Sequence, residues 1–415
     1  MASAAVFSTW GIGVKGLARL GYTVLIGRAF GTETLGHASA LMSLSIFVAL
    51  LWPTAAGNTA SRFVALALHR SESEAAVTKA LGTSMLVSSV VLGVAAVPVA
   101  RALGNGWTLS LLGAWLVVGY GLYAFARGAQ LGYHRAGRVA SWDTVSAAVA
   151  LGALVAVVAG GQGALVLAPL ALGYTVFAVA CWPRSRAGSG DAAPAVREAL
   201  RFAAWNVLAG LTTNGLLQLA MIAAQVVAPG REAGVYAAAF TLATPASMLG
   251  QAVSQIVIPA FAHRGEGASL RNRGPLLVFG VFSLVAAVVF GAMALLAPWY
   301  LPLFYPAEGA DAVPVLRLLM LGVYVFTVAL IPAALLLATG RSRSVALVSV
   351  AGFAAGVVTI VATASSAGVQ AGSVGFLVGS TINLVAVLWL ALRAPRPGPD
   401  APSTVQSGTA PDVAV

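Results

Sequence analysis

The chain alternates long apolar stretches with short polar linkers over nearly its whole length. A helix of about 20 apolar residues, rising 1.5 Å per residue, matches the ~30 Å hydrocarbon core of a bilayer. With 59% hydrophobic and 8% charged residues, the chain has too little polar surface to cover a water-soluble globule. The sequence therefore predicts an all-α integral membrane protein with about twelve transmembrane helices, at residues 5–28, 36–58, 80–101, 107–131, 139–160, 164–182, 202–228, 233–259, 275–299, 313–338, 344–365 and 371–392.

Arginine and lysine fall almost entirely on every second linker. Of the 23 basic residues, 17 follow the even-numbered stretches or lie in the tail, and three, Arg28, Arg101 and Arg231, lie on the other side. Basic loops stay in the cytoplasm, so both termini are predicted to be cytoplasmic. The net charge of +11 then mainly reflects the basic cytoplasmic loops, and lipid headgroups of the bilayer are its expected partner. We expect no nucleic-acid partner.

The composition also indicates a compartment. The chain has 21 Arg against 2 Lys and is rich in alanine and glycine, which is typical of a GC-rich bacterial genome. We therefore expect a multi-pass protein of the bacterial cytoplasmic membrane.

A polar stretch after the sixth apolar segment divides the chain into two halves. We expect an N-terminal six-helix lobe at 1–183, a cytoplasmic linker at 184–201, a C-terminal six-helix lobe at 202–393 and a disordered cytoplasmic tail at 394–415. Each half opens alike, with GTETLGHASA from Gly31 and GREAGVYAAA from Gly230. This internal repeat predicts two lobes of common origin.

Cysteine and histidine give no sign of a metal or cofactor site. Cys181 is the single cysteine, and the four histidines lie in or beside linkers without the spacing of metal ligands. We expect no cofactor, no metal and no catalytic residue.

Two segments resemble a known family. The segment IGRAFGTETLGHASA, from Ile26, is similar to the opening of bacterial polysaccharide and lipid-linked oligosaccharide flippases, and the stretch from Glu232 to Pro259 is similar to their seventh-to-eighth helix hairpin. These proteins belong to the multidrug/oligosaccharidyl-lipid/polysaccharide (MOP) exporter superfamily. The resemblance implies two six-helix lobes around a central cavity that opens alternately to each side, and a polyprenyl-pyrophosphate-linked sugar as substrate.

Two cations lie deep in the first predicted span. At 1.5 Å per residue, Arg19 lies about 13.5 Å inward of Arg28 and Lys15 about 20 Å inward. A cation at mid-bilayer costs at least ~2.5–3.5 kcal/mol on insertion scales, and like charges at i,i+4 share a helix face. A water-filled cavity that receives a pyrophosphate would compensate both, because guanidinium and ammonium groups bind phosphate oxygens. The alternative is that Lys15 snorkels to the interface.

Other polar residues are candidates for lining the same cavity. Arg62, at the end of the second span, is expected either to guard the cytoplasmic mouth or to anchor the topology. The amides Asn214 and Gln218 of the seventh span, and Gln251 and Gln255 of the eighth, should face inward, to bind sugar hydroxyls or to link helices.

Acidic residues are rare in the spans. Of the twelve Asp and Glu, only Asp143 lies in one, close to Arg138, which predicts a helix cap or a local ion pair. The small-residue pairs Gly128/Gly132, Gly352/Gly356 and Gly375/Gly379 are expected to pack helices closely.

The sequence thus favours a flippase that moves a lipid-linked, anionic glycan precursor from the inner to the outer leaflet by alternating access. A multidrug exporter is the first alternative, although organic cations call for intramembrane carboxylates or aromatic cages. A membrane glycosyltransferase or polymerase would need clustered acids or a metal, and we expect no enzyme. A non-transporting partner of other polysaccharide-assembly membrane proteins is the remaining alternative.

Overall fold

The computed structural model describes the whole chain except residues 1, 71, 185–192, 263–269, 339–340 and 394–415, so the predicted tail and residues 185–192 of the predicted linker lie outside the described residues. The described part contains helices and no strand. The helices are α1 Ala2–Leu50, α2 Pro53–His69, α3 Ala75–Ala102, α4 Trp107–Gly132, α5 Ala136–Ala159, α6 Ala168–Cys181, α7 Ala193–Gly210, α8 Leu216–Val227, α9 Arg231–Ala262, α10 Arg273–Phe304, α11 Gly309–Ala338, α12 Ser342–Ala367 and α13 Ala371–Leu392.

The predicted plan of about twelve spans is confirmed. Nine stretches of the described residues are long and apolar enough to cross a bilayer. Two of them each contain two spans, because α1 turns at Gly31 and because only the short 3₁₀ turn Gly368–Gln370 separates α12 from α13. Helix α9 supplies the remaining span.

The first two spans are joined without a loop. Gly31 has a φ of 83° and a ψ of 171°, a conformation that glycine adopts without a steric penalty, so the chain changes direction there in the middle of α1. The second span then breaks again at Leu51 and Trp52 and resumes as α2 with Pro53 in its first turn, where proline is tolerated. It continues to His69, well beyond the predicted end at residue 58.

The seventh span is also in two parts. It begins at Ala193, inside the predicted linker, and α7 and α8 are separated by a π-helical turn at Leu211–Gly215. A π turn leaves backbone carbonyls without their usual partners. Two hydroxyls of this turn donate to carbonyls of the preceding turn, Thr213 Oγ1 to that of Ala209 at 2.7 Å and Thr212 Oγ1 to that of Leu208 at 3.0 Å.

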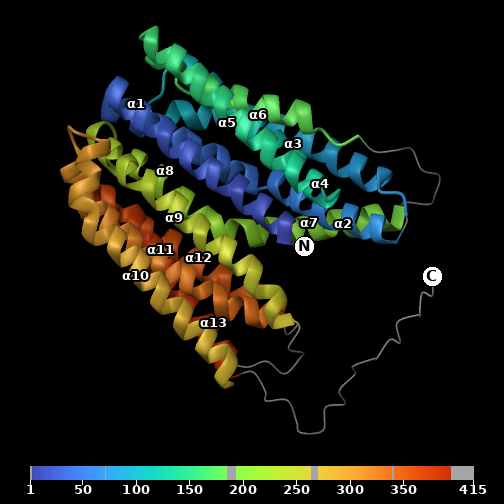
Figure 1. Cartoon of the computed structure of the whole chain (residues 1–415). Coiled ribbons are helices and arrows are strands. Elements are labelled where there is room, and N and C mark those ends of the chain that lie inside the picture. Colours follow the sequence, from blue (N-terminus) through green and yellow to red (C-terminus); the bar gives the residue numbers. More distant parts are fainter. Residues whose placement is uncertain (1, 71, 185–192, 263–269, 339–340, 394–415) are drawn as a thin grey trace, which may run out of the picture.

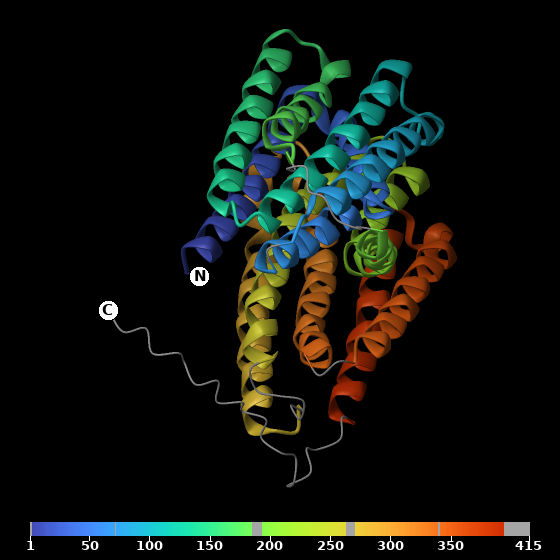
Figure 2. The same ribbon diagram turned by 90° about the vertical axis from the view of Figure 1, so that its right-hand side faces the viewer.

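The helices form two lobes (Figures 1 and 2). One contains α1 to α6 and the other α8 to α13, and α1 runs beside α9 along the boundary between them. Helix α7 crosses this division, because it packs against α2 and α3 of the N-terminal lobe. Its side chains Ala199 and Ala203 are buried in a cluster with Ala56, Phe63 and Leu81.

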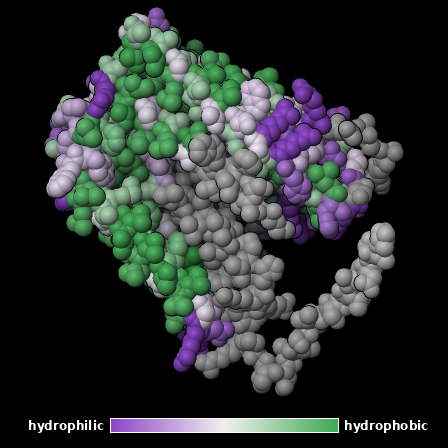
Figure 3. Space-filling view, viewed as in Figure 1, coloured by the Kyte–Doolittle hydropathy of each residue, from purple (hydrophilic) through white to green (hydrophobic). Residues whose placement is uncertain are grey.

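The outer surface is that of a membrane protein (Figure 3). Hydrophobic side chains cover a broad face of the molecule, and the hydrophilic ones gather at its ends. On α10, Leu295 is 74% exposed and Trp299 80%. Large apolar groups exposed in such numbers need lipid, because a soluble monomer rarely presents an apolar patch of this extent.

The two copies of the internal repeat pack against each other where the lobes meet, which we call the repeat contact. Gly31 and Gly230 open their copies with φ of 83° and 82°. A Cβ added at Gly36 would lie 2.9 Å from the backbone nitrogen of Gly234, and one added at Gly234 would lie 2.5 Å from the carbonyl carbon of Thr32. The two backbones therefore touch with no room for a side chain.

Polar contacts reinforce this end of the molecule. His37 Nδ1 lies 3.3 Å from Gln225 Nε2 of α8. Arg28 donates from Nε to the carbonyl of Phe304 at 3.0 Å and from Nη2 to that of Leu303, at the end of α10. The lobes are thus sealed together near the repeat contact by backbone packing and by hydrogen bonds between lobes.

The predicted small-residue pairs lie at helix contacts inside each lobe. A Cβ at Gly128 would lie 2.5 Å from the carbonyl carbon of Gly57 on α2. A Cβ at Gly352 would lie 2.8 Å from the carbonyl oxygen of Gly379, so α12 and α13 also pack backbone to backbone. The glycines serve close helix packing, as predicted.

Candidate functional site

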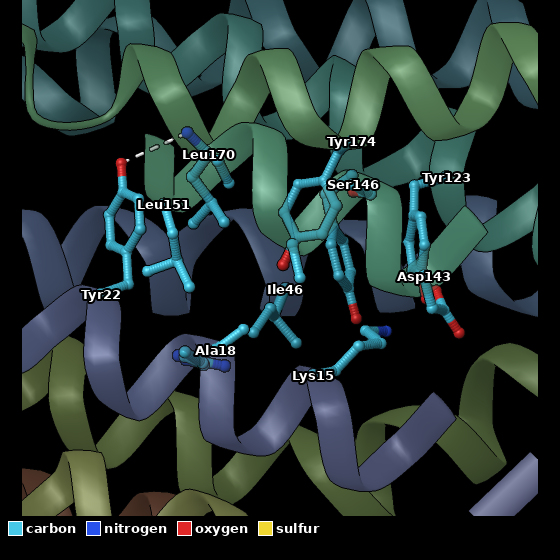
Figure 4. A pocket seen from close by; sticks show the side chains of 14 residues that line it. Lys15, Ala18, Tyr22, Ile46, Tyr123, Asp143, Ser146, Leu151, Leu170 and Tyr174 are labelled. Carbon is cyan, nitrogen blue, oxygen red and sulfur yellow. Dashed lines mark hydrogen bonds between the residues drawn. The ribbon is translucent and has the colours of Figure 1, made fainter. Parts of the chain in front are cut away.

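The cations Lys15 and Arg19 lie one turn apart on α1 and line a cavity enclosed by the N-terminal lobe (Figure 4). The wall comes from α1, α4, α5 and α6. The cavity has a volume of about 60 Å³, enough for a few water molecules. Lys15, Tyr123 and Asp143 lie at one end of it, and Tyr22 and Leu170 at the other.

Tyrosine rings dominate the wall that faces the two cations. Lys15 Nζ lies 4.1 Å from the ring centroid of Tyr123, a cation–π contact. The Tyr174 ring lies 5.0 Å from that of Tyr123 and 5.2 Å from that of Tyr120. The ring faces can stabilise a positive charge without neutralising it.

Asp143 is the one carboxylate in the cavity wall, and its side chain is fully buried. Its Oδ1 accepts a hydrogen bond of 2.8 Å from the Tyr123 hydroxyl, and its Oδ2 lies 3.3 Å from Arg127 Nε. The predicted ion pair is therefore present, but its expected partner was wrong, because Arg138 instead donates to the carbonyl of Ala180 at 2.7 Å. The helices α4 and α5 run antiparallel, which brings Arg127 to the depth of Asp143.

The cavity region carries an excess of positive charge. Lys15, Arg19 and Arg127 are three cations, and Asp143 is their single acidic neighbour within the described residues. The one ion pair that Asp143 makes in this part of the chain is with Arg127. Lys15 and Arg19 make no ion pair with an acid among the described residues, and an unpaired charge in a membrane interior is costly.

The far end of the cavity is a structural anchor. The Tyr22 hydroxyl donates to the carbonyl of Val166 and accepts a hydrogen bond of 3.2 Å from the backbone nitrogen of Leu170. These bonds tie α1 to the start of α6. They hold the helix that carries both cations against the opposite wall.

Arg62 does not join the other two predicted cations. It lies on α2 with an exposed side chain, and its Cζ is 4.5 Å from the ring centroid of Phe202 on α7. The guanidinium therefore covers the contact between α2 and α7.

The two predicted amides whose side chains are described, Asn214 and Gln218, do not line this cavity. Asn214 lies in the π turn, where its Nδ2 donates to Thr213 Oγ1 at 3.3 Å. Gln218 is buried on α8, and its Oε1 has no hydrogen-bond partner among the described atoms. Gln251 and Gln255 lie on α9, but their side chains are outside the described part of the structure.

The sequence analysis missed Arg127 and the tyrosines. Arg127 was counted among the topology-setting residues near a helix end, yet it lies within α4 with its side chain only 20% exposed. The signal was available, because Tyr120, Tyr123 and Arg127 are spaced by three and four residues and so share one helix face.

Among the described residues no group of three or more His, Cys, Asp or Glu is arranged to hold a metal ion. The charged groups of the cavity, with Lys15 and Arg19 unpaired by acid, are suited to binding an anion by charge-assisted hydrogen bonds.

Solved structures with the same fold are transporters. An inward-facing multidrug resistance MATE family transporter of the MOP superfamily is 16% identical, with a TM-score of 0.71 over 93% of this chain and 97% of its own. The lipid II flippase MurJ, in an inward closed conformation, is 12% identical, with a TM-score of 0.70 over 93% and 87%. No family model matches the sequence. No curated protein matches it either.

A further MATE structure was solved in another state. An outward-facing MATE family transporter of the MOP superfamily is also 16% identical and covers 94% of both chains, but its TM-score is 0.59.

Proposed function

Starting from a chain that has the fold of the MOP superfamily transporters, we propose that it moves a lipid-linked, anionic glycan precursor across the bacterial cytoplasmic membrane by alternating access. The observation that carries the proposal is the surplus of cations around the cavity of α1, with Lys15 and Arg19 left unpaired by acid. A pyrophosphate between sugar and lipid supplies the matching negative charge.

In this proposal the two cations hold the phosphates while the lipid tail stays in the bilayer. The cavity holds only water-sized groups in the described state, so a phosphate group would enter by displacing water from between the two side chains. We propose that both termini are cytoplasmic and that the repeat contact closes the outer side. We also propose that the lobes extend over residues 1–183 and 202–393. The amides of Asn214, Gln218, Gln251 and Gln255 are proposed as sugar-binding groups.

Export of organic cations is the rival within this fold, because MATE transporters share it. The tyrosine wall is the kind of surface that binds such cations. Lys15 already occupies the Tyr123 ring, however, and the surplus positive charge would repel a second cation. We therefore favour an anionic substrate.

The test is leaflet accessibility of lipid-linked glycan in a depletion strain that is complemented with defined variants. Lys15→Ala/Arg19→Ala should lower the outer-leaflet fraction by more than about tenfold, because each charged hydrogen bond that is lost weakens binding. The double variant Lys79→Ala/Arg197→Ala removes one lysine and one arginine with exposed side chains and should leave the fraction unchanged.

A charge-preserving variant refines the test. Lys15→Arg/Arg19→Lys should keep most of the activity if charge is what matters at these positions. Normal distribution of precursor with Lys15→Ala/Arg19→Ala, at equal membrane levels, would overturn the proposal. Precursor that stays normally distributed in the depleted strain itself would favour drug export or a role in glycan assembly.

A further inference from the structure

We propose that Arg127 is a positioning residue that keeps Lys15 available for an anion, by holding the Asp143 carboxylate that would otherwise neutralise the lysine. The inference rests on the proposed function and assigns a role to a residue that touches no substrate. It concerns why a carboxylate is present beside a site for an anion.

Asp143 lies within reach of α1. A Cβ added at Gly11 would lie 2.9 Å from Asp143 Oδ2, so the helix backbone passes directly beside the carboxylate. Lys15 follows Gly11 by four residues and therefore leaves α1 on the same face. Its long, flexible stem could bring the ammonium group to this carboxylate.

The structure shows a different pairing. Asp143 Oδ2 is taken by Arg127 Nε at 3.3 Å, and Oδ1 by the Tyr123 hydroxyl at 2.8 Å. The ammonium of Lys15 instead lies over the Tyr123 ring, 4.1 Å from its centroid. Tyr123 therefore links the two groups, because the hydroxyl that binds Asp143 also fixes the ring beneath Lys15.

Removing Arg127 changes the charge balance around the cavity. When the fully buried carboxylate of Asp143 loses Arg127, it should form an ion pair with the nearest other cation, because an unpaired buried charge is strongly destabilising. Lys15 is that replacement, and a lysine bound to Asp143 no longer attracts a phosphate. Arg19 would then be the single cation left for the ligand.

This reasoning predicts a rescue. Arg127→Gln should lower two measured quantities by at least about tenfold: the flipping of precursor, and the binding of inorganic pyrophosphate to the full-length protein in nanodiscs. This is the effect of losing one charge-assisted hydrogen bond to the ligand. Adding Asp143→Asn to that variant should restore both to within about threefold of the wild type, because Lys15 then has no carboxylate to bind. Arg127→Lys, which keeps a cation opposite Asp143, should retain activity.

Arg138→Gln is the matched control, since Arg138 binds a backbone carbonyl and makes no ion pair with Asp143. It should leave both readouts unchanged. A purely structural role for the Arg127–Asp143 pair predicts that the Gln/Asn double variant is at least as impaired as Arg127→Gln. That result, or wild-type behaviour of Arg127→Gln, would overturn the inference.

The controls separate this inference from the proposed function. If Lys15→Ala/Arg19→Ala still binds pyrophosphate and flips precursor, the proposed function fails, and this inference fails with it. If that variant is inactive while Arg127→Gln is normal, the cationic site stands and only the positioning role of Arg127 is refuted.

Discussion

Filling the repeat contact should open the end of the molecule that it seals. A Cβ at Gly234 would lie 2.5 Å from the carbonyl carbon of Thr32, whereas ordinary contacts begin at 3.4 Å. The backbones would have to separate by about 1 Å. Overpacking costs about 1–3 kcal/mol, and the upper end applies because backbone rather than a flexible side chain must move. About 3 kcal/mol changes a two-state population ratio by more than about 100-fold.

The predicted effect of Gly234→Val is measured with a single reporter cysteine. Cys181 is buried and is the only cysteine, so Cys181→Ala gives a clean background. Ser39 is 2% exposed and follows Gly36 by three residues, on the same helix face. In Ser39→Cys, labelling by an impermeant maleimide added outside spheroplasts should be slow with Gly234 and much faster with Gly234→Val.

Gly291→Val is the matched control. It also places a β-branched residue in a helix, but a Cβ at Gly291 meets nothing within 4 Å, so it carries the propensity cost without the clash. Labelling that is equally fast in Gly234→Val and Gly291→Val, at equal protein levels, would refute the view that the repeat contact is a closed gate.

Two further changes test the packing. Arg28→Ala should raise the labelling rate of Ser39→Cys less than Gly234→Val does, because water replaces the exposed hydrogen bonds to Leu303 and Phe304. Arg28→Lys should restore slow labelling only in part, since one ammonium group cannot reproduce the two hydrogen bonds of the guanidinium. An unchanged labelling rate with Arg28→Ala would contradict this prediction. Gly128→Val should destabilise the N-terminal lobe by about 1–3 kcal/mol by forcing α4 from α2, seen as a lower thermal unfolding midpoint in detergent, while Gly152→Val, with open space around its Cβ, serves as control.

The number of spans could be predicted from the sequence because length and hydropathy are local properties. The boundaries were less accurate where backbone geometry decided them. At Gly31 the chain turns within one residue, so the polar stretch that separates the first two predicted spans is helical on both sides of the turn rather than a loop. At Ala193 the helix begins among polar residues, because α7 packs against α2 and α3 and its helical structure does not depend on span hydropathy.

Only the part of the site that depends on local sequence could be predicted. Lys15 and Arg19 were noticeable because charges are rare in an apolar run, and one helical turn places them together. The pairing of Asp143 with Arg127 depends on the relative depth of α4 and α5, which the sequence does not encode in any spacing. Proximity along the chain therefore favoured Arg138, the wrong partner.

The two parts of the seventh span, α7 and α8, pack in different lobes. Because α7 packs against α2 and α3 of the N-terminal lobe, while α8 packs on α12 and α13 as well as on α1, the C-terminal half of the sequence donates a helix to the other lobe. The halves are thus interlocked like partners in a domain swap, and any rocking of one lobe against the other has to flex the backbone around Leu211–Gly215. The π-helical turn would then be the hinge of such a motion, and its resistance to bending would set how easily one lobe rotates against the other.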